Sequence, residues 1–161
     1  MKTLKMQLIP KTCSGQNIRN KYPKDWKHMS KLVRIGANNK CEICGSAVLR
    51  YTDLEAHEVW KFKKIKTKNG KTKRVQILKD VMAICPLCHA AIHIGFSTHN
   101  DKYDEAVTHY MAVNDCRYSD VRDAEKKAYL KWKKRSKHDW ELITTKKEAW
   151  KIVKKHAKKN Q

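Results

Sequence analysis

The sequence lacks any run of 18 or more apolar residues, so it contains no candidate membrane-spanning helix. Its first residues, MKTLKMQLIPK, lack the continuous apolar segment that a secretory signal peptide needs, and we expect no such signal. Internal repeats and low-complexity linkers are also missing. Because 40% of the 161 residues are hydrophobic, the chain is not wholly disordered. Its length fits one domain with a modest core, or a small domain with helical extensions.

Acidic side chains are scarce: 16 Asp and Glu stand against 37 Lys and Arg, which gives a net charge of +21. Residues 1–40 carry +9 and residues 117–161 carry +10, whereas residues 41–116 carry only +2. Basic flanks around a nearly neutral centre suit a polyanion, because Lys and Arg displace counterions from phosphates. We therefore expect a nucleic-acid partner, DNA before RNA. The alternatives are a solvated Lys-rich surface, an anionic membrane surface and an acidic protein partner.

Hydrophobic spacing and turn residues predict a mixed α+β chain. Residues 1–9 suit a short strand or an ordered arm with Leu4, Met6 and Leu8 on one side. Helices are predicted over residues 25–35, 86–94, 101–113, 120–137 and 146–158, and extended segments over 48–51, 54–62 and 75–78, with a hairpin turn at Asn69 and Gly70. Three aromatic residues are interpreted as packing anchors rather than base-stacking platforms: Trp132, Trp140 and Trp150.

Four of the six cysteines form two C-x-x-C pairs, Cys41 with Cys44 and Cys85 with Cys88. Without a secretory signal, such pairs indicate a metal site rather than disulfides, and a reducing, intracellular, cytoplasmic setting. Four thiolates fit a closed tetrahedral structural Zn²⁺ site. The remaining two cysteines, Cys13 and Cys116, are interpreted as structural.

Three histidines lie close to these pairs. His89 and His93 are four residues apart in the predicted helix and therefore share a face, while His57 lies on the strand before the hairpin. Three imidazoles can meet at one ion and leave a position open for water or phosphate. This pattern predicts a second divalent ion, either Mg²⁺, Mn²⁺, Ni²⁺ or Zn²⁺, although a lone histidine is more often a packed or solvated residue.

These motifs together resemble the HNH endonuclease family. The likeness covers residues 38–95 and includes HEVW from His57 and ICPLCHAAIH from Ile84, which are similar to a bacterial and phage branch of that family. The resemblance implies a ββα-metal finger, with His57, His89 and His93 as ligands of the catalytic ion. It also implies an HNH-like core over residues 38–97. The charge and the hydrophobic spacing predict an N-terminal arm and helix before it (residues 1–37) and a basic helical extension after it (98–161). A phage-encoded protein acting in a bacterial host fits the same branch.

Two positions depart from the family pattern. Glu58 stands where the family has the histidine general base, and Asp80 stands where it has the middle Asn. Glu can serve as a base next to a metal, as in the HExxH zinc proteases. However, His57 and Glu58 would point to opposite faces of a regular strand. In the family, local distortion of the backbone turns both side chains inward.

The sequence therefore predicts metal-dependent phosphodiester hydrolysis of DNA, with catalytic roles for His57, Glu58 and Asp80. Arg50 or Arg74 would help to hold a phosphate. The hairpin would grip the backbone through Lys61, Lys63, Lys64, Lys66, Lys68, Lys71, Lys73 and Arg74. Two alternatives remain: a catalytically inactive HNH-fold zinc protein that binds nucleic acid or a host nucleic-acid machine, and an inhibitor of an acidic protein. The Glu58 departure favours the inactive protein, and the three retained histidines favour the enzyme.

Overall fold

The computed structural model describes residues 2–97 and 102–159 and has a mixed α+β architecture. Its sheet has the order β1-β2-β3, formed by β1 (Glu55–Lys66), β2 (Thr72–Ile84) and β3 (Glu141–Leu142). The helices are η1 (Lys11–Cys13), α1 (Ile18–Lys21), α2 (Pro23–Gly36), η2 (Tyr51–Asp53), α3 (Pro86–Ile92), α4 (Ile94–Ser97), α5 (Tyr103–Asn114), α6 (Tyr118–Arg135) and α7 (Lys146–Lys159). No helix in this described part is long and apolar enough to cross a bilayer.

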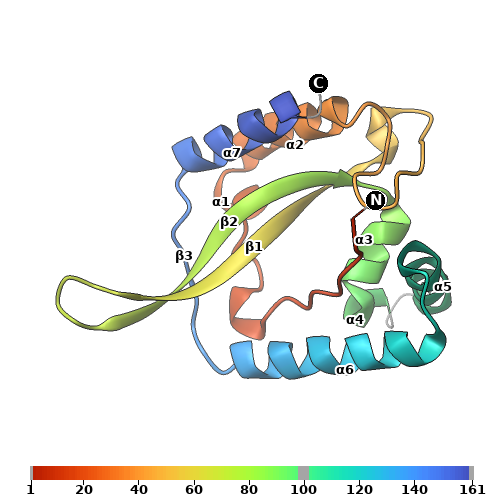
Figure 1. Ribbon diagram of the computed structural model, residues 1–161. Helices are drawn as coiled ribbons and strands as arrows, with labels where there is room; N and C mark the ends of the chain where they lie inside the picture. The colour runs from red at the N-terminus through yellow and green to blue at the C-terminus, as the bar shows by residue number, and fades with distance from the viewer. Residues whose placement is uncertain (1, 98–101, 160–161) are drawn as a thin grey trace.

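A long antiparallel hairpin of β1 and β2 is the central element, and its tip projects beyond the helices (Figure 1). The predicted turn is confirmed. Gly70 has φ +72° and its N–H donates to Thr67 O at 3.0 Å, while Asn69 stays out of the left-handed region. One glycine in that region is what a hairpin loop with a bulge requires. Both strands are longer than predicted.

Two stretches differ from the sequence prediction. The segment predicted as extended at residues 48–51 forms no strand. Arg50 keeps an extended backbone with φ −135° and ψ 147°, but the Asp53 carboxylate accepts its N–H at 3.0 Å and Tyr51 begins the turn of η2. The predicted helix over residues 86–94 breaks at His93, which has φ −101° and ψ 43°. His93 N–H still donates to His89 O at 3.1 Å, so the one-turn spacing between these residues survives the break. The prediction missed α1 and β3.

The other predicted helices correspond to α2, α5, α6 and α7. The predicted start of α5 at Asp101, and the predicted boundary at residue 98, lie outside the described residues. In Figure 1, α2 and α7 lie side by side above the hairpin, and α6 runs along the opposite side. Gly36 of α2 allows this approach, because a Cβ there would lie 3.3 Å from the Ala157 backbone.

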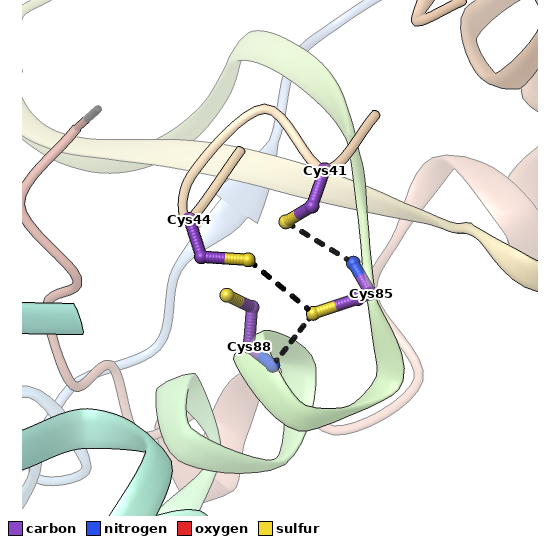
Figure 2. Close-up of side chains that lie close together, drawn as sticks. All are labelled: Cys41, Cys44, Cys85 and Cys88. Carbon is purple, nitrogen blue, oxygen red and sulfur yellow. Dashed lines mark hydrogen bonds between the residues drawn. The ribbon is translucent and has the colours of Figure 1, made fainter. Parts of the chain in front are cut away.

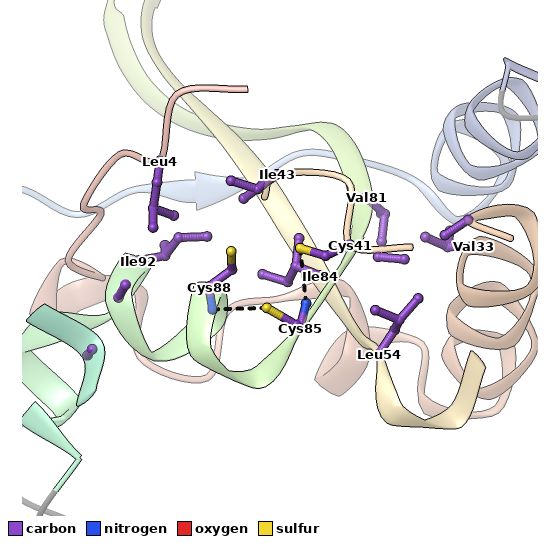
Figure 3. Packing of buried hydrophobic residues seen from close by; sticks show 14 of the residues in the cluster. Leu4, Val33, Cys41, Ile43, Leu54, Val81, Ile84, Cys85, Cys88 and Ile92 are labelled. Carbon is purple, nitrogen blue, oxygen red and sulfur yellow. Dashed lines mark hydrogen bonds between the residues drawn. The ribbon is translucent and has the colours of Figure 1, made fainter. Parts of the chain in front are cut away.

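The hydrophobic core draws on all three predicted parts of the chain, with Leu4 from the arm, Ile84 from β2 and Val153 from α7 all fully buried. Burying a side chain of this size contributes about 1.5–3 kcal/mol. Figure 3 shows Cys41, Cys85 and Cys88 inside this core, between Leu4 and Ile92 on one side and Val33 and Leu54 on the other.

The N-terminal residues form an ordered arm rather than a strand. Leu4 is buried while Met6 and Leu8 pack against the core, as the alternation predicted. Gln7 N–H donates to Ile92 O at 2.7 Å, which fastens the arm beside α3. The arm also comes close to α4, because a Cβ on Gly95 would meet Leu8 at 2.9 Å.

Candidate metal centres

The four paired cysteines converge from three elements (Figure 2). Cys41 and Cys44 lie on the loop after α2, Cys85 follows β2, and Cys88 lies in α3. Their Sγ atoms all lie within 4.8 Å of one another. A tetrahedron with zinc–sulfur bonds of about 2.3 Å has sulfur–sulfur edges of about 3.8 Å. The 3.8 Å from Cys44 Sγ to Cys85 Sγ fits this, so the cysteines could hold a metal such as zinc.

Backbone N–H groups already point at the sulfurs. Cys85 N–H donates to Cys41 Sγ at 3.3 Å, and Cys88 N–H donates to Cys85 Sγ at 3.4 Å. The thiols share protons: hydrogen bonds from Cys85 and Cys88 lower the pKa of Cys41, whereas the hydrogen bond to Cys41 raises the pKa of Cys88. His109 Nε2 lies 3.1 Å from Cys88 Sγ and can donate to a thiolate. The surroundings thus favour one thiolate, at Cys41, and a bound cation would be needed to hold the other sulfurs in the deprotonated form that ligates zinc.

The three predicted histidines also meet. Their ring centroids are 5.0 to 5.2 Å apart, and one nitrogen of each ring lies within 4.8 Å of the others. His57 comes from β1, His89 from α3 and His93 from the turn directly after it. We call this group the histidine cluster. The short helix and the hairpin together bring the three rings to one point, as the spacing predicted.

Outer partners orient two of the rings. His89 Nδ1 is hydrogen-bonded to the Glu55 carboxylate, and His93 Nδ1 lies 3.0 Å from Gln7 O. A carbonyl can only accept, so His93 Nδ1 carries the proton and Nε2 keeps a lone pair. A carboxylate or carbonyl behind the imidazole is the usual outer partner of a metal-binding histidine. The donor set therefore fits a divalent ion.

Burial keeps His57 and His93 uncharged. Burial, together with the neighbouring imidazoles, lowers the pKa of His57 to about 3 and that of His93 to about 4. His57 is only 6% exposed. At neutral pH these rings are therefore neutral, which is the form that binds metal.

Glu58 reaches across to α1, where its Oε1 accepts the Ile18 N–H at 2.7 Å. Burial raises the pKa of the Glu58 carboxyl to about 7, although the backbone N–H groups of Ile18 and Arg19 partly oppose this rise. Glu58 thus has a structural partner in addition to any chemical role. Sequence reasoning missed this partner because α1 itself was missed.

His57 and Glu58 nevertheless line one cavity of about 770 Å³, which we call the histidine cleft. Its lining includes residues of the arm, β1 and α6. It is lined by Gln7, Leu8, Ile9, Asn17, Arg19, Trp26, Ala56, His57, Glu58, Trp60, His89, His93, Gly95, Tyr129 and Trp132. The two strand neighbours therefore border the same cavity, despite the alternation expected of a regular strand.

Asp80 lies away from this cleft. Its Oδ1 is 2.9 Å from His156 Nδ1, and His156 Nε2 is 2.9 Å from Glu42 Oε2. Both carboxylates raise the pKa of His156 to about 9 against the opposing effect of burial. The structure thus joins Asp80 to α7 and to the cysteine loop rather than to the histidine cluster. The sequence signal was a histidine on the buried face of α7, beside Val153.

The two arginines proposed for phosphate binding also lie elsewhere. Arg50 pairs with Asp53 at 3.3 Å on the surface. Arg74 lines a separate cavity of about 720 Å³ with Trp140. Among the hairpin lysines, Lys73 pairs with Glu141 at 3.1 Å. The other predicted contacts, Lys61, Lys63, Lys64, Lys66, Lys68 and Lys71, are exposed along the hairpin.

Two predicted packing anchors pack as expected: Trp140 is buried, and Trp150 packs against the core with its Nε1–H donating to Asp25 Oδ1 at 2.8 Å. Trp132 differs, because it is half-buried and lines the histidine cleft. Cys13 is buried and Cys116 is half-buried, and both are free thiols.

In comparisons with known proteins, no family model, no curated protein and no solved structure matches this chain. The resemblance to HNH endonucleases therefore rests on the residues themselves.

Proposed function

We propose that this protein is a metal-dependent phosphodiester hydrolase of the HNH type that acts on DNA. The observation that carries the proposal is the histidine cluster, three imidazoles meeting at one point in a cleft. A purely structural finger needs only the four cysteines. A second donor set, with its own outer partners Glu55 and Gln7, is what a catalytic ion would require.

His57, His89 and His93 would hold the ion. When bound, it supplies positive charge that polarises the scissile phosphate and stabilises the leaving 3′-oxygen. Glu58 lines the same cleft and would accept a proton from the attacking water. The water oxygen then bonds to phosphorus as the bond from phosphorus to the 3′-oxygen breaks. The exposed hairpin lysines would hold the flanking phosphates.

The ββα character of the proposal is supported by the order of elements. β1, β2 and α3 follow one another, and the histidines come from β1 and from the end of α3. The cysteine cluster joins the loop before β1 to the start of α3, so a zinc there would brace the finger.

One observation favours the binding-only alternative. Glu58 already accepts the Ile18 N–H, so a carboxylate at this position has a use without catalysis. In that case the protein would bind nucleic acid, or a host nucleic-acid machine, without cutting.

Cleavage of supercoiled plasmid, with Mg²⁺, Mn²⁺, Ni²⁺ or Zn²⁺ added to the purified protein, tests the proposal. We expect nicking with at least one ion, and its loss in His57→Ala. His28→Ala, an exposed histidine on α2, is the matched control and should cut normally. Absence of cutting with every ion, together with tight DNA binding, would favour the binding-only function.

Glu58→Gln separates the two roles of Glu58. The amide oxygen of Gln can still accept the Ile18 N–H, but Gln cannot take a proton from water. A Gln variant that melts normally and does not cut identifies Glu58 as the base. A Gln variant that cuts normally restricts Glu58 to stabilising α1.

A further inference from the structure

Two aromatic residues of α6, Tyr129 and Trp132, line the histidine cleft, and we call them the aromatic wall. The rings of Tyr129 and Trp132 are stacked, with centroids 5.4 Å apart and an interplanar angle of 29°. Trp132 Nε1–H donates to Ile9 O at 2.9 Å, which fixes its plane against the arm. Tyr129 is 51% exposed although it lines the cleft. A large aromatic side chain held in place yet exposed inside a cleft offers a flat surface for a ligand.

Basic groups lie beside Trp132 and in the adjoining cavities. Lys11 Nζ lies 5.4 Å from the centroid of the Trp132 ring, and Arg135 lies 4.2 Å from that of Phe62. Phe62 lines an adjoining cavity together with Trp132. Arg19 lines the histidine cleft itself, in which Glu58 is the one acidic residue among the described lining residues. Cations beside aromatic faces suit a ligand with both a flat ring and a phosphate.

The wall and the histidine cluster line the same cavity. Its volume of about 770 Å³ falls within the range of about 300–1,000 Å³ that is common for small-molecule sites. A base inside a duplex is stacked and paired, so it cannot enter such a cavity without being turned out of the helix. A base in a single strand or a melted segment can enter directly.

We propose that the histidine cleft takes one unpaired nucleobase, stacked on the exposed ring of Tyr129 with Trp132 behind it, so that an adjoining phosphate meets the histidine cluster. This inference rests on the proposed function and names its substrate class: DNA that is single-stranded or locally unpaired. It also assigns to Trp132 the stacking role that the sequence did not predict.

The test compares binding of three fluorescent ligands of equal length: single-stranded oligothymidylate, a strand of abasic sugar-phosphate units, and a duplex. The abasic strand keeps the charge and removes every base. Fluorescence anisotropy, with gels to verify that the ligands stay intact, gives the Kd values. We expect the single strand to bind about tenfold more tightly than the abasic strand, the effect of stacking one base, and more tightly than the duplex.

Tyr129→Ala should abolish the preference over the abasic strand, and Tyr118→Ala should keep it. Tyr118 is a matched control, because it lies on the same helix, is 52% exposed and does not line the cleft. Neither substitution removes a buried side chain, so both variants should fold. Equal binding of all three ligands by the wild type, or an unchanged preference in Tyr129→Ala, would overturn the inference.

The binding and cleavage experiments can reject the base site and the proposed hydrolysis independently of each other. If plasmid is never cut but the preference for bases depends on Tyr129, the proposed hydrolysis fails and the base site remains. If plasmid is cut and the preference is absent, hydrolysis stands and the base site is rejected. Equal or tighter binding of an acidic peptide, with no response to bases, would assign the cleft to a protein partner and reject the base site.

Discussion

Cys88 and His89 are neighbours in the chain, yet they belong to clusters with opposite surroundings. The cysteine cluster has three members within the hydrophobic core and Cys44 packed against it, and the Cys41 and Cys85 sulfurs accept backbone N–H groups. The histidine cluster borders a cleft, and its outer partners Glu55 and Gln7 lie behind the rings. The first arrangement is closed and suits stability, whereas the second leaves room for a ligand.

Two histidines repeat this contrast. His57 and His156 are each 6% exposed, but their pKa values move in opposite directions, to about 3 and to about 9. His57 faces other imidazoles, while His156 lies between the carboxylates of Glu42 and Asp80. Burial alone therefore does not decide the charge of a histidine. The charged one fastens α7 to the cysteine loop, and the neutral one remains able to bind a metal.

The largest expected effect is the loss of stability when the cysteine cluster is changed. Cys85→Ser should lose bound zinc and cooperative thermal unfolding, because structural zinc contributes about 10–16 kcal/mol in zinc-finger peptides and a whole domain is stable by about 5–15 kcal/mol. Circular dichroism melting and zinc content measure this. Cys116→Ser, outside the cluster, should keep both. A Cys85→Ser protein that melts like the wild type would refute a structural role for the cluster.

The His156 network should give a smaller, pH-dependent effect. The folded pKa of about 9 lies above the ordinary value of 6.5, so the stabilisation is complete below pH 6.5 and is lost as the pH rises to about 9. The loss amounts to about 3 kcal/mol. Glu42 and Asp80 face His156 directly, and the Lys2 ammonium lies 3.8 Å from Glu42.

Urea unfolding of the wild type and His156→Gln across this pH range measures the difference. The variant should be less stable at pH 6 and approach the wild type at pH 9. His28→Gln, on the exposed side of α2, should follow the wild type throughout. Parallel stability curves for the wild type and His156→Gln would show that His156 does not titrate between these values.

The sequence predicted both clusters because their chemistry is local. The C-x-x-C spacing places two sulfurs on one turn, and the spacing of His89 and His93 places two rings one turn apart. It did not predict the partners that come from distant segments. Asp80 was assigned to the catalytic site by its place before Cys85, but its partner His156 is contributed by α7, and no short-range pattern joins the two.

The secondary structure was likewise predictable where the signals are local and not where the partners are distant in sequence. Asn69 and Gly70 signalled the hairpin, and amphipathic spacing signalled α2 and α7, because these signals act over a few residues. The two-residue strand β3 pairs in parallel with β2, although more than sixty residues of sequence separate them. Glu141 and Leu142 carry no local pattern that predicts this pairing. The partner Glu55 had a local signal, since it lies two residues before His57 and therefore on the same strand face.

In the histidine cluster, Glu55→Gln should weaken binding of the divalent ion that we propose for this site, without unfolding the protein. Loss of the charged outer partner of His89 lowers metal affinity by about 10–100-fold, while an exposed substitution changes stability by at most about 0.5 kcal/mol. Isothermal titration with Mn²⁺ measures the affinity. Glu141→Gln is the control, with an exposed side chain that pairs with Lys73. Equal affinities would mean that Glu55 does not tune the cluster.

The smallest expected effect is on the salt dependence of DNA binding, and it should differ between two lysines of the hairpin. Lys73 pairs with Glu141 at 3.1 Å, whereas Lys68 lies exposed at the tip that projects beyond the helices (Figure 1). If the tip holds a DNA phosphate, Lys68→Gln should reduce the slope of log affinity against log salt by about 0.9. Lys73→Gln should change it less, because that ammonium already has a carboxylate partner. Anisotropy titrations at several salt concentrations give both slopes. Equal slopes in the wild type and Lys68→Gln would remove the tip from the binding surface and leave the histidine cleft and the flanking basic segments to hold the nucleic acid.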